Sequence, residues 1–187
     1  MLEDCISADG RFVIALIRDG VEVGGEATPR EIGTIALIEE VGDRGEKVVP
    51  LLALGEQRVR IGELDHSLPY LSANVEPLHE PVDEDIDPEL IEQARAATTR
   101  FARAMLMQIR GEWRANPEMP DEPGALGYRM GTLMAGRPTA AQRVLEAASL
   151  TKRLRQAVPA VEAAAGEFEA ALLEQGAQDH RRGMHRN

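Results

Sequence analysis

Ser149 and Lys152 are the two side chains in this sequence whose spacing comes closest to a catalytic arrangement. In an S-x-x-K segment on a helix, the serine is a nucleophile and the lysine, one turn away, can accept its proton. The K-T-G triplet that accompanies this segment in such serine enzymes does not occur in the sequence. Serine is also a preferred residue at a helix N-terminus. We therefore interpret Ser149 as the cap of the last helix.

Asp83, Asp85 and Asp87 alternate along the chain, as do the first ligands of a calcium-binding loop. That loop also needs a turn glycine and a bidentate glutamate, and the corresponding positions hold Pro88 and Ala94. The four histidines are scattered, and no G-x-x-x-x-G-K-[ST] phosphate loop is present in the sequence. We predict no catalytic residue, no metal site and no cofactor, so the chain is not expected to be an enzyme.

The charge of the chain limits the partners that it can bind. Its 187 residues carry 21 Lys and Arg against 32 Asp and Glu, a formal net charge of -11. Nucleic-acid phosphates and anionic membranes would repel such a chain, so we expect neither as a partner. A single cysteine, Cys5, fits a reducing compartment, and no segment has the length and hydropathy of a membrane span. We predict a soluble, cytoplasmic protein.

The first part of the chain alternates short apolar runs with turn-forming residues, which is typical of β-strands. The turn signals include Asp19-Gly20 and Gly24-Gly25. We expect strands at Phe12–Ile17, Ile32–Ile38, Val48–Leu54, Arg58–Leu64 and Tyr70–Glu76. With no long helix between them, these strands predict a mainly antiparallel or mixed sheet curled into a small barrel.

The second part of the chain has helical periodicity. An acidic, proline-containing segment at residues 76–92 ends in Asp87-Pro88, an N-cap followed by a first-turn proline. Apolar residues then predict one long amphipathic helix to about Trp113, two short helices, and a last helix with an apolar stripe from Leu150 to Leu172 that Pro159 should kink or interrupt. We expect a β-domain at 1–80, a helical bundle at 81–174 and a disordered tail at 175–187.

Two groups of apolar residues are candidates for contact with a polypeptide. Phe12, Ile14 and Leu16 lie in the first predicted strand, whose edge would be open if the barrel lacked strands. Met105 and Met107 belong to a group of methionines in the helical half, and flexible thioethers suit surfaces that accept varied apolar partners. Core filling in a chain with 3% aromatic residues explains the methionines equally simply and is the favoured interpretation for them.

Several segments, in order, resemble the N-terminal substrate-binding domain of Lon proteases. The resemblance covers about Met1 to Leu154 and includes the G-T-x-A strand at Gly33–Ala36. The matching segments are Leu2–Ile6, Asp9–Arg18, Glu22–Gly25, Glu31–Ala36, Leu54–Ile61, Pro69–Glu76, Gln142–Ala147 and Thr151–Arg155.

The resemblance implies an α+β protein: a small PUA-like β pseudo-barrel followed by an α-helical bundle with one long helix. It also implies a role in recognising polypeptide substrates. The ATPase and Ser-Lys peptidase of the family have no counterpart in the sequence, so the chain resembles a free-standing Lon-domain protein. The family's first strands precede the position that corresponds to Met1, so either the true start lies upstream or the barrel is short of strands. In the second case the open edge needs a partner chain to cover it, and we expect a homo-oligomer.

The sequence and the resemblance together indicate two main candidate functions, which belong to different classes. The first is a non-catalytic module that binds unfolded or partner polypeptides through exposed apolar surface, with strand addition at an open edge as one mode. The alternative is a structural or regulatory protein that binds one specific folded partner. An enzyme that uses Ser149 or the acidic segment is a third possibility, for which the sequence offers no assembled set of residues.

Overall fold

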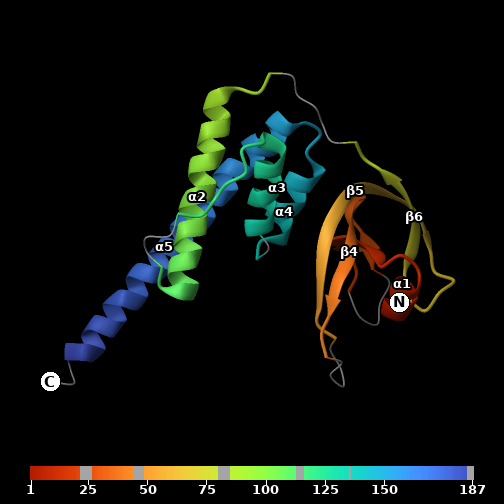
Figure 1. Ribbon diagram of the computed structural model, residues 1–187, viewed down its shortest axis with the longest axis horizontal. Helices are drawn as coiled ribbons and strands as arrows, with labels where there is room; N and C mark the ends of the chain where they lie inside the picture. The colour runs from red at the N-terminus through yellow and green to blue at the C-terminus, as the bar shows by residue number, and fades with distance from the viewer. Residues whose placement is uncertain (22–26, 44–48, 80–84, 113–115, 135, 185–187) are drawn as a thin grey trace. The chain divides into compact units, whose positions relative to one another are not determined.

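The computed structural model of the chain divides into two compact units, Met1–Glu80 and Pro81–Asn187, and each is described by itself (Figure 1). The structure describes residues 1–21, 27–43, 49–79, 85–112, 116–134 and 136–184. The predicted turn at Gly24-Gly25 lies outside these ranges. No helix in the described ranges is long and apolar enough to span a bilayer.

The first unit is an antiparallel sheet preceded by a short helix (Figure 1). Its elements are α1 (Leu2–Ser7), β1 (Arg11–Ile14), β2 (Ile17–Asp19), β3 (Thr28–Pro29), β4 (Ile32–Val41), β5 (Leu51–Asp65) and β6 (Ser72–Pro77). Four strands form one sheet in the order β1-β4-β5-β6, and every neighbouring pair is antiparallel. Strands β2 and β3 pair separately.

The predicted α+β class and the antiparallel sheet are confirmed, whereas the described strands form an open sheet and no closed barrel. The two runs predicted as separate strands around Gly55 form one strand, β5, because both parts pair with β4. A register shift beside Gly55 accommodates the join. At Asp19-Gly20 the predicted turn is present, with Gly20 at a φ of 89° that favours glycine.

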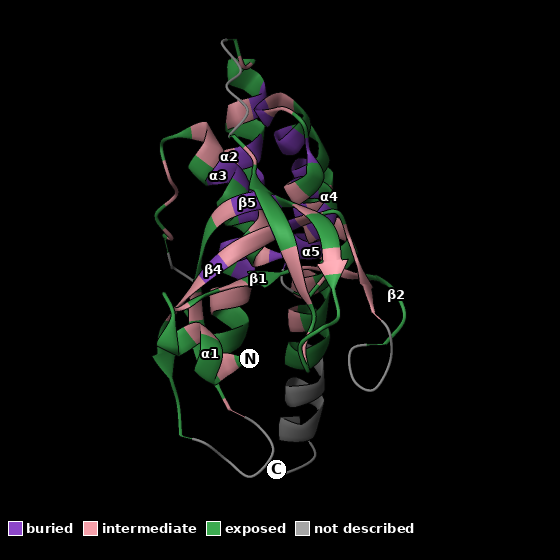
Figure 2. Ribbon diagram, turned by 90° about the vertical axis from the view of Figure 1, so that its right-hand side faces the viewer, coloured by how far each residue is buried: buried purple, intermediate pink, exposed green. Residues whose placement is uncertain are grey.

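Little of the first unit is buried. Ala36 and Val59 are its only buried apolar residues among those that the structure describes. Gly33 allows the close approach of β1 and β4, because a Cβ at this position would lie 2.8 Å from the carbonyl oxygen of Ile14. Consistent with the small number of buried residues, long stretches of β5 are exposed (Figure 2).

The second unit contains four helices among the described residues, in agreement with the predicted bundle. They are α2 (Pro88–Arg110), α3 (Pro123–Leu133), α4 (Pro138–Glu146) and α5 (Leu150–Met184). Asp87 caps α2 by accepting a hydrogen bond of 2.9 Å from the amide of Glu89, and Gly111 ends the helix at a φ of 68°. The core lies between α2 and α5, with α3 and α4 packed against it.

Helix α5 differs from the sequence-based expectation at two places. It runs through Pro159, and it continues to Met184 although we expected disorder from Gln175. Because proline has no amide hydrogen, the carbonyl of Arg155, four residues earlier, lacks its helical hydrogen bond. Pro159 and Arg155 are both exposed, so water can replace that bond. Extending an established helix also costs far less than starting one, so the polar last turns can continue it.

Most of the apolar stripe that begins at Leu150 is buried inside the helical unit. Leu150, Leu154, Val158, Val161 and Ala165 are buried in the core, and α5 packs mainly against α2. An apolar helical stripe of this kind can also serve as a surface for self-association. Because its first four turns are already covered by the unit's own helices, that part is not available to a second copy.

Candidate functional site

The most exposed apolar surface of the first unit is the outer part of the β4–β5 hairpin. We call residues 37–41 of β4 and 51–56 of β5 the ribbon. Strand β1 pairs with β4 only at Thr34 to Leu37, and β6 pairs with β5 only from Val59 onward. Among the described strands, residues 51–56 therefore have no partner on the side of β5 that faces away from β4. This free edge is about 20 Å long.

Aliphatic side chains project from both faces of the ribbon. Leu52 and Leu54 are 54% and 53% exposed and lie on one face, because side chains two residues apart in a strand point the same way. Leu51 and Val41 are opposite each other in the register and lie on the other face, also exposed. The ribbon thus combines a free main-chain edge with apolar side chains in water, which is the combination that strand addition requires.

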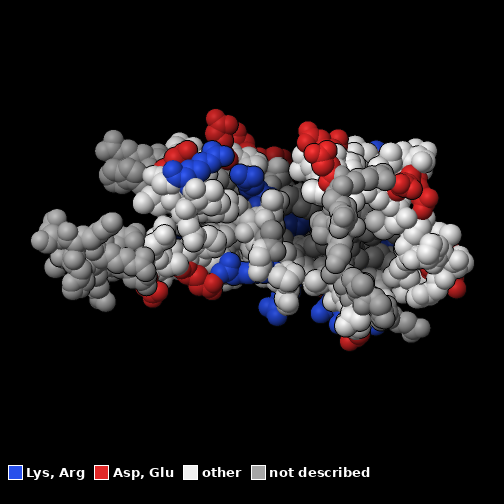
Figure 3. All heavy atoms as spheres, turned by 90° about the horizontal axis from the view of Figure 1, so that it is seen from below, with Lys and Arg blue, Asp and Glu red and all other residues white. Residues whose placement is uncertain are grey.

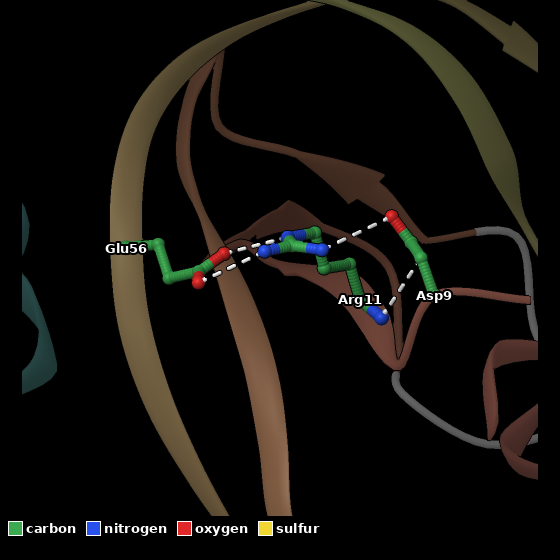
Figure 4. Close-up of polar contacts among 3 residues, drawn as sticks. All are labelled: Asp9, Arg11 and Glu56. Atoms are coloured by element: carbon green, nitrogen blue, oxygen red, sulfur yellow. Dashed lines mark hydrogen bonds and ion pairs between the residues drawn. The ribbon is translucent and has the colours of Figure 1, made fainter.

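A salt bridge holds the base of the ribbon. Glu56 is skipped by the pairing of β4 with β5, since Ile35 pairs with Gln57 and Ala36 pairs with Gly55. The extra residue is aimed across β4 and its carboxylate accepts two hydrogen bonds from Arg11, at 2.7 and 3.1 Å (Figure 4).

Arg11 also bonds the carboxylate of Asp9 at 3.4 Å, and the two carboxylates raise the pKa of the guanidinium, Glu56 most strongly. The contact ties β1 to β5 across β4, on the side of β5 opposite to the free edge. We infer that it limits the movement of the ribbon relative to the rest of the sheet.

Gln57 marks the inner end of the free edge. Its side-chain amide donates 2.6 Å to the carbonyl of Leu78 and 3.2 Å to the carbonyl of Arg58. The amide of Leu78 in turn bonds the carbonyl of Arg58 at 2.9 Å. Residue 78 therefore occupies the edge of β5 at Arg58, and the free part begins beyond this point.

The five residues predicted for polypeptide contact fall in both units. Phe12 is half-buried opposite Ala36, Ile14 is exposed at the end of β1, and Leu16 is half-buried after it. The two methionines lie in α2, Met105 half-buried and Met107 exposed. The structure brings Phe12 and Ile14 into one strand of the sheet that carries the ribbon, and places the methionines on the other unit.

The leucines of the ribbon were missed as contact residues. The run from Val48 to Leu54 was predicted only as a strand, and its leucines were not singled out as contact residues. The acidic residues Glu39 and Glu40 opposite it were the available signal, because a strand with charges beside its turn is one that reaches solvent.

The candidates for chemistry take structural roles where they are described. The hydroxyl of Ser149 accepts a hydrogen bond of 3.2 Å from the amide of Lys152, so the serine caps α5 as predicted. Asp87 caps α2, and Asp83 lies outside the described residues. Among the described side chains, no three His, Cys, Asp or Glu residues lie close enough together to hold a metal ion.

An antiparallel sheet with an accessible edge and a helical bundle together define an α+β protein. The chain belongs to the family described as the ATP-dependent protease La (LON) substrate-binding domain, whose model matches residues 1–162. The resemblance noted in the sequence is thereby confirmed. A search of curated proteins found no match to the chain.

Two solved structures are similar in fold. The crystal structure of a Lon N-terminal domain protein from Xanthomonas campestris has a TM-score of 0.56 and 23% identity, covering 82% of this chain and 78% of that one. The N-terminal domain of a Mycobacterium avium complex Lon protease has a TM-score of 0.48 and 20% identity, covering 81% of this chain and 89% of that one. The first of these supports the α+β fold described above.

Proposed function

We propose that this protein is a non-catalytic, cytoplasmic module that recognises polypeptides. Family membership supports a substrate-binding module. The single observation that carries the proposal further is the free edge at residues 51–56, flanked by the exposed side chains of Leu52 and Leu54.

The ribbon would bind an extended segment by adding it as a strand beside β5. Each main-chain hydrogen bond contributes about 1 kcal/mol net, and covering a half-exposed leucine contributes roughly 1 kcal/mol more. A few such contacts, less the cost of ordering the segment, correspond to affinities on the order of micromolar. Main-chain pairing depends little on sequence, so the module would accept many unfolded chains with some preference for aliphatic residues.

The alternative proposal is a structural or regulatory protein that binds one specific folded partner. The exposed leucines would serve such an interface as well, since exposed apolar patches mark protein contacts of both kinds. Saturable binding to a single folded protein, without affinity for unfolded chains, would favour this alternative.

The experiment that tests the proposal measures binding of a fluorescent, permanently unfolded model protein by anisotropy. We expect the double substitution Leu52→Ser and Leu54→Ser to weaken binding by about thirtyfold, because two covered leucines together contribute about 2 kcal/mol. Ile109→Ser is the matched control, since Ile109 is 69% exposed on α2 and is also an aliphatic residue lost to solvent.

Strand addition itself is tested with a short aliphatic peptide and a copy of it that is N-methylated at every second residue. The methylated peptide keeps its side chains but cannot donate to β5, so we expect its binding to be lost. A folded protein that binds no unfolded chain, or one that binds both peptides equally, would refute strand addition at the ribbon.

A further inference from the structure

The free edge of the ribbon has a defined main-chain pattern. The carbonyl oxygen of Pro50 accepts a hydrogen bond of 2.8 Å from the amide of Gly42, just beyond β4, so residue 50 faces β4. Successive residues of an antiparallel strand direct their main-chain groups to alternate sides. The residues of β5 whose amide and carbonyl face the free edge are therefore Leu51, Ala53 and Gly55.

The neighbouring edge strand, β6, is protected by a proline. The amide of Leu78 bonds the carbonyl of Arg58 at 2.9 Å, so Leu78 faces β5 and Pro77, the residue before it, faces away. A proline at this position offers no amide to an added strand. Pro50 gives the ribbon no such protection, because it faces β4 and not the free edge.

Charge does not protect the free edge either. Residues 51–55 read Leu-Leu-Ala-Leu-Gly, whereas charged side chains are a common protection of edge strands. The acid that follows, Glu56, is bonded to Arg11 across β4 (Figure 4). Figure 3 shows Asp and Glu side chains in several groups on the surface, and the chain carries a formal charge of -11. Two copies therefore repel each other at a distance, but without like charges along this edge.

This edge is complementary to itself. When two copies pair antiparallel about a twofold axis at Ala53, this residue lies opposite the partner's Ala53, and Leu51 lies opposite the partner's Gly55. All of these residues face the free edge, and facing residues in an antiparallel pair exchange both of their main-chain hydrogen bonds. The resulting seam has about six such bonds.

The same arrangement brings the leucines of the ribbon together. Leu52 lies opposite the partner's Leu54 in a non-hydrogen-bonded pair, where the side chains are closest. Both leucines are more than half exposed in the single chain, and the four from two copies cover one another on one face. On the other face, Leu51 meets the partner's Gly55, which has no side chain to obstruct it.

The seam is short, so the pairing is reversible. Five residues a side compare with about 20–30 in a stable protein interface. We expect a dissociation constant on the order of tens of micromolar. Pairing of this kind is isologous, so it uses both free edges and leaves none for a third copy.

We propose that the ribbon is also the contact between two copies of this chain, paired edge to edge about Ala53, and that this dimer closes the site to other polypeptides. The dimer follows from the edge alone, whereas its effect on binding rests on the function proposed above. An unfolded chain that binds more tightly than the second copy opens the dimer. The free edge is then covered whether or not a substrate is present.

Sedimentation of the full chain at several concentrations tests the dimer. We expect the dimer fraction to rise with protein concentration and to rise several-fold more between about 20 and 300 mM salt, because salt screens the repulsion between acidic copies. An association held by ion pairs would weaken over the same range. Weakening with salt would therefore contradict pairing through an uncharged seam.

Ala53→Pro tests the main-chain pairing. It removes an amide that faces the free edge and leaves the bonds to β4 in place. Each main-chain bond corresponds to about fivefold in an association constant, so losing one from each copy should weaken the dimer about thirtyfold. Val75→Pro is the matched control, because Val75 faces away from β5 on the protected edge, as Pro77 does, and should leave the dimer unchanged. Far-UV circular dichroism reports whether each variant folds.

A charge exchange at residue 53 tests the register. Ala53→Asp and Ala53→Lys should each weaken the dimer about tenfold, since a twofold axis at this residue places like charges directly opposite each other. An equimolar mixture of the two variants should recover dimers that contain one copy of each. Any other register would separate the two charges and give no recovery.

Three results would overturn the dimer: a monomer at every concentration up to about 1 mM, a dimer that Ala53→Pro leaves intact, or a mixture of the charged variants that pairs no better than either alone. A dimer that binds an unfolded model protein without dissociating would overturn the exclusion. Failure of the proposed function is distinguishable, because the dimer would form as described while no unfolded chain binds at any protein concentration.

Discussion

At the scale of single residues, two arginine–carboxylate pairs connect elements that are far apart in the sequence. Arg11 with Glu56 joins β1 to β5, and Arg100 with Glu169 joins α2 to α5. Both are bidentate and both are exposed to solvent, so each fixes geometry more than it adds stability. The first holds the base of the ribbon, and the second joins the two longest helices described.

The Arg100–Glu169 pair predicts a dependence of stability on pH. The hydrogen bond from Arg100 lowers the pKa of Glu169 below its usual 4.5, so the pair stabilises the folded state above that value and its contribution is lost as pH falls through the lowered pKa. Thermal midpoints of the protein and of Glu169→Gln should therefore differ slightly at neutral pH and converge in acid. A difference that grows as pH falls below 4.5 would contradict this assignment.

Phe101 is the largest fully buried apolar side chain among the described residues of the helical core. It is 1% exposed and its ring meets that of Phe168 edge to face, with centroids 5.2 Å apart. We expect Phe101→Ala to lower the free energy of unfolding by about 3–5 kcal/mol, measured by urea titration of helical circular dichroism. Met107→Ala, at an exposed position of the same helix, is the control, and a loss below about 1 kcal/mol for Phe101→Ala would show that the core can close around the gap.

Caps could be predicted from the sequence because their chemistry is local. Asp87 and Ser149 cap their helices as predicted, since an N-cap needs only the right side chain and the amides that follow it. The Arg11–Glu56 pair could not be predicted, because the two residues are 45 positions apart and meet only through the register of β4 and β5.

At the scale of elements, the helices were predicted more accurately than the strands. The apolar spacing that indicates α2 is a local property, and Pro88 and Gly111 mark its ends. Strand β5 was predicted as two strands because Gly55 breaks the apolar pattern, and only the pairing with β4 shows that the strand continues. Helix α5 was predicted too short, because a proline and a polar end carry no information on how strongly the helix is held by its neighbours.

Glycine positions give a prediction for two elements. Gly33→Ala should weaken the pairing of β1 with β4, by roughly 1–3 kcal/mol, because the new Cβ would lie 2.8 Å from a main-chain oxygen that cannot move alone. Gly166→Ala in α5 is the matched substitution with nothing within 4 Å, and it should stabilise the helix by about 0.5–1 kcal/mol. Denaturant unfolding of both variants checks the pair, and equal effects would contradict the close approach at Gly33.

At the scale of the whole molecule, the two units differ in how much of their apolar surface is buried. The helical unit has a connected apolar core, whereas the sheet of the first unit buries little among its described residues and exposes many aliphatic side chains. Membership of the Lon substrate-binding domain family supports a substrate-binding module in general terms. The ribbon is the place where we propose that substrates are bound.

Self-association is expected at the ribbon if no other polypeptide is present. Two free edges of the same chain can pair with each other, as exposed strands of natural proteins do unless they are protected. Light scattering should give a mass that rises toward a dimer with concentration, and Leu52→Ser with Leu54→Ser should shift it toward the monomer. A mass that stays monomeric at high concentration would remove self-association and leave the binding of unfolded chains as a separate question.

The central claim is that residues 51–56 of β5 bind an unfolded polypeptide as an added strand, and amide hydrogen exchange measures this most directly. With a saturating unfolded model protein, we predict slower exchange for the amides of residues 51–56 that point away from β4, and little change at the edge near Leu78, which is already paired. Binding that protects other segments and leaves residues 51–56 exchanging as in the free protein would contradict the account.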